Sequence, residues 1–149
     1  VHDARELEKA VNAQYDDCDA LVMAAAVSDY RPAVRAENKI KKEQHDHLNI
    51  ELTENPDILY GLGQKKTHQF LVGFAAETRD VIEYGKAKLA KKNLNLLVAN
   101  DVAQQGAGFN VSTNIAALIY KDGHIEQYLK MTKDDLGHII IEKIAEGIN

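Results

Sequence analysis

The stretch "DALVMAAAVSDYRP" at residues 19–32 is central to the fold, because an uncharged run of small and apolar residues ends abruptly at a charged corner. Such a run is typical of a strand buried in a parallel sheet. Two similar runs follow, "FLVGFA" at 70–75 and "LNLLVAN" at 94–100. Helical patterns separate the runs, so we predict an α/β fold with a mostly parallel sheet and helices on both faces.

Capping residues mark the starts of two helices in the first half of the chain. Asp3 precedes apolar residues at helical spacing and is the expected N-cap of a helix over residues 4–16. The sequence "NPDILYGL" at 55–62 predicts a second helix, with Asn55 as its N-cap and Pro56 in its first position.

Two further helices are predicted in the second half. Residues 80–92 form a charged helical pattern whose inward positions are Val81, Ala87 and Leu89. Thr132 is followed three residues later by Asp135, which resembles a capping box and begins the last helix.

Other segments predict antiparallel structure. "LNIELT" at 48–53 alternates apolar and polar residues, as expected of a half-buried strand. "AALIYKDGHIEQYLK" at 116–130 predicts a hairpin that turns at Asp122-Gly123. We expect these segments to form an antiparallel appendage, whereas residues 30–47 are polar and predict a long loop.

The composition indicates one globular domain over residues 1–149. Hydrophobic residues make up 45% of the chain, and the net charge of −5 argues against a broadly basic nucleic-acid-binding surface. No apolar stretch approaches the roughly 20 residues that span a bilayer, so we expect no membrane partner. The single cysteine, Cys18, fits a reducing compartment such as the cytoplasm. We interpret it as a packed thiol, with a catalytic nucleophile as the alternative.

Three expected strand ends are the best candidates for a binding site. In open α/β sheets, ligands bind outside the carboxyl ends of the strands. Here "AAAVSDYRP", "GFAAET" and "VANDV" each combine small residues, which admit a ligand close to the backbone, with an acidic residue: Asp29, Glu77 or Asp101. Alternatively, the alanines pack helices against the sheet and the acidic residues cap helices.

Lysines are the second candidate feature. One group lies in "NKIKK" and comprises Lys39, Lys41 and Lys42. On the charged helix, Lys88, Lys91 and Lys92 share a face near the C-terminus, where the helix dipole favours cations. They could neutralise phosphates, or they could simply form a solvated helix end.

Several common motifs are absent. "GLG" at 61–63 and "GAG" at 106–108 lack the third glycine of a dinucleotide fingerprint, which argues against a nicotinamide-dependent reductase. No phosphate-loop motif occurs. His45 and His47 lack visible metal-ligating partners, so we interpret them as exposed histidines.

The motifs occur in an order that closely resembles one family. "AAAVSDYRP", "KIKK", "ENPDIL", "GFAAET", the lysine-rich helix, "NLLVAND" and "GF" followed by "N" resemble the phosphopantothenoylcysteine synthetases. These enzymes are also called phosphopantothenate–cysteine ligases, and the resemblance is to the bacterial CTP-using type. It extends from about Val1 to Ile148.

This resemblance implies a Rossmann-like fold and a two-step reaction in coenzyme A biosynthesis. With CTP and a divalent metal, usually Mg²⁺, such an enzyme converts 4′-phosphopantothenate to an acyl-cytidylate and releases pyrophosphate. The cysteine amine then attacks the activated carbonyl and releases CMP. The resemblance further implies a homodimer whose sites draw on both subunits. Many bacterial relatives carry a flavin-dependent decarboxylase upstream, which makes a fused or associated decarboxylase an expected partner.

The resemblance also assigns residues, while leaving the metal ligands unknown. Lys39 matches a flap lysine that is important for activity, and Asp29 matches the nucleotide-binding aspartate. We expect Asp29 to accept hydrogen bonds from the base or sugar, and Arg31 to orient the mobile segment or an anionic substrate. The remaining nucleotide-contacting positions are Met23, Ala24, Ala25, Pro56, Asp57, Ile58, Leu59, Phe74, Lys88 and Lys92.

One family segment has no match here. It is a glycine-rich, asparagine-containing portion that binds phosphopantothenate and precedes the part corresponding to Val1. We therefore expect a chain that binds CTP without completing ligation alone, with an exposed sheet edge. The alternative interpretation is a non-catalytic nucleotide-binding or dimerisation fragment of the same enzyme.

Overall fold

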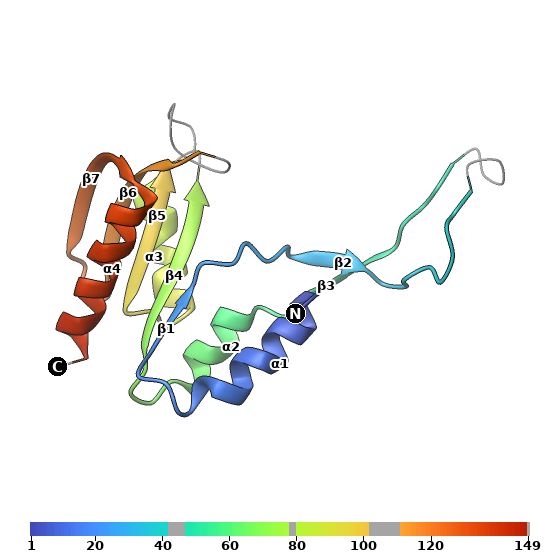
Figure 1. Ribbon diagram of the computed structural model, residues 1–149, viewed down its shortest axis with the longest axis horizontal. Coiled ribbons are helices and arrows are strands. Elements are labelled where there is room, and N and C mark those ends of the chain that lie inside the picture. Colours follow the sequence, from blue (N-terminus) through green and yellow to red (C-terminus); the bar gives the residue numbers. More distant parts are fainter. Residues whose placement is uncertain (42–46, 78–79, 102–110, 149) are drawn as a thin grey trace.

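The computed structural model describes residues 1–41, 47–77, 80–101 and 111–148 (Figure 1). Five strands form one sheet in the order β1-β4-β5-β6-β7, in which β1, β4 and β5 are parallel and the last two are antiparallel. Their bounds are β1 (Ala20–Met23), β4 (Phe70–Glu77), β5 (Leu96–Asp101), β6 (Thr113–Tyr120) and β7 (Ile125–Thr132). The predicted α/β architecture is confirmed.

Helices cover both faces of this sheet, because residues on the central strands alternate between two apolar cores. On β5, Leu97 and Ala99 pack in the core beneath α1 (Ala4–Tyr15), α2 (Ile58–Lys65) and α3 (Val81–Lys91). Leu96 and Val98 face the opposite way, toward α4 (Lys133–Gly147). In the described part of the chain, no helix has both the length and the apolar character needed to cross a bilayer.

The helix starts follow the predicted capping residues with one exception. Asp3 caps α1 through bonds from the amides of Arg5 and Glu6, and Thr132 caps α4. The prediction of Asn55 as the cap of α2, with Pro56 in the first helical position, is wrong, because α2 begins at Ile58. Asp57 fills that place, because its side chain accepts a hydrogen bond from the Tyr60 amide, and Asn55 bonds elsewhere.

Strand β1 is parallel, as predicted, but it is not buried. It lies at the edge of the sheet, where Val22 is 40% exposed, because β4 pairs with it on one side only. The strand also ends at Met23, so the alanines at residues 24–26 lie beyond its carboxyl end. On α3, Gly85 rather than the predicted Ala87 faces the core, where Ile119 and Leu97 crowd it.

The two antiparallel segments behave differently. Strands β2 (Tyr30–Pro32) and β3 (Leu52–Glu54) pair at the base of a long arm, whose described residues are 30–41 and 47–54, that projects away from the sheet (Figure 1). Leu48, Ile50 and Leu52 are all more than half exposed, so the predicted half-buried strand is wrong. The hairpin turns at Asp122-Gly123 as predicted, yet β6 joins β5 and thereby extends the main sheet.

Candidate functional site

A cavity of about 270 Å³ lies beyond the ends of β1 and β4, between the start of α2 and the last turn of α3. It gathers segments that are far apart in sequence. The predicted residues that line it are Met23, Ala25, Asp29, Pro56, Asp57, Ile58, Leu59, Phe74, Lys88 and Lys92. Two of the three predicted strand ends, those of β1 and β4, therefore contribute to one cleft, whereas Asn100 at the end of β5 lines a second cavity.

Two predicted site residues lie elsewhere. Ala24 lines a neighbouring cavity of about 410 Å³ on the α4 side, together with Asn100, Asn114 and Lys133. The two cavities share the wall made by residues 25–26 and 74–76. Lys39 is exposed on the arm and belongs to the lining of neither cavity, so its catalytic role stays a prediction.

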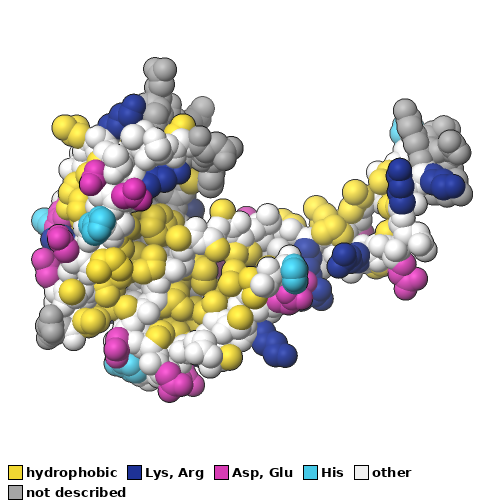
Figure 2. Space-filling model, in the orientation of Figure 1, with side chains coloured by type: hydrophobic (Ala, Val, Ile, Leu, Met, Phe, Trp, Pro, Cys, Tyr) yellow, Lys and Arg dark blue, Asp and Glu magenta, His cyan; other side chains and the backbone are white. Residues whose placement is uncertain are grey.

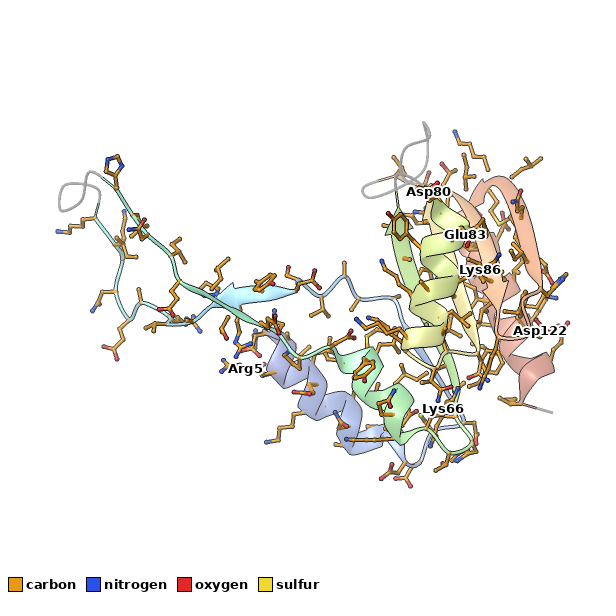
Figure 3. The ribbon with its side chains drawn as sticks, turned by 180° about the vertical axis from the view of Figure 1, so that it is seen from behind. Arg5, Lys66, Asp80, Glu83, Lys86 and Asp122 are labelled. Atoms are coloured by element: carbon orange, nitrogen blue, oxygen red, sulfur yellow. The ribbon has the colours of Figure 1, made fainter. Side chains whose placement is uncertain are left out.

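The lysines of α3 divide between the cavity and the outer surface. Lys88 and Lys92 are one helical turn apart and both line the cavity. Lys86 instead pairs with Glu83 at 3.1 Å on the outside of the helix (Figure 3). Lys91 is exposed and is not part of the lining, so the predicted grouping of three lysines reduces to two.

Lys92 is held in place by Asp57. Its ammonium group lies 2.8 Å from the Asp57 carboxylate, and the Lys92 side chain is only 25% exposed. The same carboxylate oxygen accepts the amide hydrogen of Tyr60 at the start of α2. Asp57 thus fixes a lysine beside the cavity, and its carboxylate both caps the start of α2 and balances the charge of that lysine.

A close contact between α2 and α3 makes that ion pair possible. A Cβ atom on Gly63 would lie 2.0 Å from the carbonyl oxygen of Lys92, so only glycine permits this approach. The Asn93 side chain then donates to the Gly63 carbonyl at 2.9 Å. Residues 63 and 92 are therefore in contact at their backbones, which positions the Lys92 side chain next to Asp57.

Other candidate groups carry less weight. The side chains of Glu77 and Asp101, and His45, lie outside the described residues. His47 is exposed, and no three His, Cys, Asp or Glu side chains of the described chain gather as a metal site. Cys18 donates to the Tyr15 carbonyl at 3.2 Å, and burial raises the pKa of its thiol, as expected of a packed rather than a reactive cysteine.

Residues 1–148 match the family described as the DNA/pantothenate metabolism flavoprotein C-terminal domain. The chain belongs to this family. It is 45% identical over 145 residues to the Coenzyme A biosynthesis bifunctional protein CoaBC of Bacillus subtilis (strain 168), covering 97% of the chain. The Escherichia coli (strain K12) protein of that name is 42% identical over 146 residues, or 95% of the chain. The chain spans 36% of the length of each relative.

Solved structures agree with this membership. A crystal structure of the C-terminal domain of a CoaBC protein superimposes with a TM-score of 0.77 at 35% identity. It covers 97% of the present chain, which in turn covers 62% of that domain. The fold is therefore shared with a relative of known structure.

Sequence reasoning missed Asn55 as a residue of this domain's cavity. It lines the cleft, yet its position before Pro56 suggested only a helix cap. Its side chain donates to the Ser28 carbonyl at 2.8 Å and accepts from Arg31 at 3.2 Å, which links the two segments that border the cavity. The sequence "ENPD" correctly indicated a nearby helix start, but it could not reveal that Asn55 bonds to Ser28, 27 residues away.

Proposed function

We propose that this chain is the part of a CTP-dependent phosphopantothenate–cysteine ligase of coenzyme A biosynthesis that binds CTP and activates the substrate carboxylate. The main support is one cavity whose lining includes Asp29, the start of α2, Phe74 and the two lysines Lys88 and Lys92. Family membership and relatives named for coenzyme A biosynthesis support the assignment.

The cavity suits a nucleoside triphosphate. Its two lysine ammonium groups offset part of the roughly four negative charges of the triphosphate. The small residues Ala25, Ala26 and Ala75 allow the nucleotide to lie close to the backbone. The exposed Asp29 carboxylate lines the same cleft and is a hydrogen-bond acceptor for the base or the sugar.

These groups support the proposed first step. The carboxylate of 4′-phosphopantothenate attacks the α-phosphorus of CTP, forming the acyl-cytidylate while the bond to pyrophosphate breaks. Negative charge grows on the phosphate oxygens as this happens, and Lys88 and Lys92, which line the cavity, would stabilise it. In the second step the cysteine amine attacks the acyl carbonyl and CMP leaves.

The proposal includes Mg²⁺, which is usually held by one or two carboxylates together with substrate phosphates. Asp29 and Asp57 are carboxylates of the cavity lining, but Asp57 is already bonded to Lys92 and to the Tyr60 amide and Asp29 is assigned to the base or sugar, so the proposal names no ligands for the ion. When bound, the ion would neutralise phosphate charge. We also propose a homodimer in which Lys39, carried on the arm, acts at a site shared between subunits, and a fused or associated flavin-dependent decarboxylase.

Calorimetric titration tests the nucleotide assignment. With Mg²⁺ present, the protein should bind CTP saturably and more tightly than ATP. Asp29→Asn should weaken CTP binding with an unchanged melting temperature. Absence of saturable binding of either nucleotide would overturn the proposal, and unchanged affinity in the variant would remove Asp29 from the site.

A second candidate is a nucleotide-binding or dimerisation part without catalysis of its own. The observation that favours it is the position of Lys39 on the arm, away from both cavities. Turnover of 4′-phosphopantothenate, CTP and cysteine by this chain alone would exclude it. CTP binding without turnover, restored in the complete bifunctional protein, would support it.

A further inference from the structure

Asn55 joins the two segments from which the arm emerges. Its side-chain amide donates to the Ser28 carbonyl at 2.8 Å, and its main-chain amide donates to the Asp29 carbonyl at 2.7 Å. Ser28 and Asp29 form one wall of the cavity, while Asn55 leads directly into Pro56 and Asp57 on the opposite wall. One residue therefore connects both walls.

Arg31 completes this connection from the arm. Its guanidinium donates to the Asn55 side-chain oxygen at 3.2 Å and also to the carbonyl of Glu54. Arg31 belongs to β2, and it lies opposite Thr53 in the short ladder with β3. The base of the arm is thus bonded to the residue that bridges the cavity, so the arm and the cavity are mechanically linked.

The side chain of asparagine suits this position because it both donates and accepts. The donor group serves the Ser28 carbonyl, and the acceptor group serves Arg31. Aspartate could accept from Arg31 but could not donate to Ser28, and alanine could do neither. Asn55 is half-buried, so bonds lost there would be only partly replaced by water.

We propose that Asn55 is a positioning residue, which holds the Asp29 wall of the cavity against the start of α2 and fixes the base of the arm. This inference rests on the proposed nucleotide-binding function. Asn55 acts on the part of the nucleotide that meets Asp29, since Lys92 is held separately, by Asp57 and by the contact at Gly63. Binding of a bare polyphosphate should therefore be insensitive to Asn55.

The test compares CTP with inorganic tripolyphosphate, both titrated calorimetrically with Mg²⁺. The protein variants are Asn55→Ala and a matched control, Asn12→Ala. Asn12 also makes one donating and one accepting side-chain bond, to the Glu8 carbonyl and from Lys65, but it lies on α1 away from the cavity. Loss of the two Asn55 side-chain bonds should weaken CTP binding about tenfold and tripolyphosphate binding less than about twofold.

The outcomes separate the two claims. If the wild-type chain does not bind CTP, the proposed function fails and the positioning role fails with it. If the wild type binds CTP and Asn55→Ala binds it equally well, only the positioning role is overturned. An equal loss for both ligands would indicate general loosening and would also overturn it.

A second variant keeps the test decisive if Asn55→Ala does not fold. Asn55→Asp retains an acceptor for Arg31, and the ratio of CTP to tripolyphosphate affinity removes any uniform effect of the added charge. That ratio should fall several-fold relative to the wild type and to Asn12→Ala. An unchanged ratio would contradict the role of the bond to Ser28.

Discussion

Gly63 is the point at which α2 touches the end of α3, and replacing it with alanine should disturb both stability and the cavity. The added Cβ would lie 2.0 Å from the Lys92 carbonyl oxygen and 2.9 Å from its carbonyl carbon. Both atoms are backbone, so no side chain can rotate away and a segment must move by about 1 Å. Overpacking of this kind costs about 3 kcal/mol at the upper end of its range. The higher helix propensity of alanine offsets about 1 kcal/mol of this cost, so the free energy of unfolding should fall by about 2 kcal/mol.

Gly61→Ala is the matched control, because it lies in the same helix and its added Cβ would meet nothing within 4 Å. It should stabilise the protein by about 0.5–1 kcal/mol. Urea unfolding of both variants measures the difference. Only Gly63→Ala should also lose CTP affinity, since the shift separates Lys92 from Asp57. If both variants raise the urea midpoint, the inferred contact is wrong.

Three further predictions address other parts of the molecule. Lys92→Ala should weaken CTP binding about tenfold while the exposed Lys91→Ala leaves it unchanged, as measured by calorimetry; equal effects would contradict the split between these lysines. Lys39→Gln in the complete enzyme should lower turnover without changing the melting temperature, and normal turnover would refute its catalytic role. The Tyr128 hydroxyl holds the pKa of the Glu126 carboxyl below its usual value, so its stabilising effect is present above the unfolded pKa and is lost as pH falls through the folded one. Glu126→Gln should therefore cost about 0.5–1 kcal/mol near pH 7 and almost nothing once the pH is below the folded pKa in urea unfolding, whereas a pH-independent loss would exclude this ionic contribution.

Signals confined to a few neighbouring residues predicted the local structure well. Asp3 and Thr132 cap their helices as expected because the bonded amides are only two or three residues away. Asn55 is not the cap because Asp57, two residues later, offers a competing side-chain acceptor. Asp57 reached the helix amide, and the Asn55 side chain found partners across the cavity instead. Capping propensity alone does not rank such distant alternatives.

Burial was harder to predict, since it depends on the neighbours that the fold supplies. The apolar run that contains Val22 predicted a buried strand, but among the strands of the described residues β1 pairs with β4 alone. Figure 2 shows hydrophobic side chains spread over this face of the molecule and along the arm. Leu48 and Ile50 alternate as in a half-buried strand, yet the arm leaves them exposed.

Local patterns were enough to predict the helices, the central strands and the small and acidic residues at the strand ends, because periodicity and capping act over a few residues. Tertiary structure decided which of those ends share a cavity. Asp29, Asp57 and Lys92 meet there only because parallel strands align their carboxyl ends and a glycine lets two helices touch. Such contacts depend on packing between residues distant along the chain, and no local pattern encodes them.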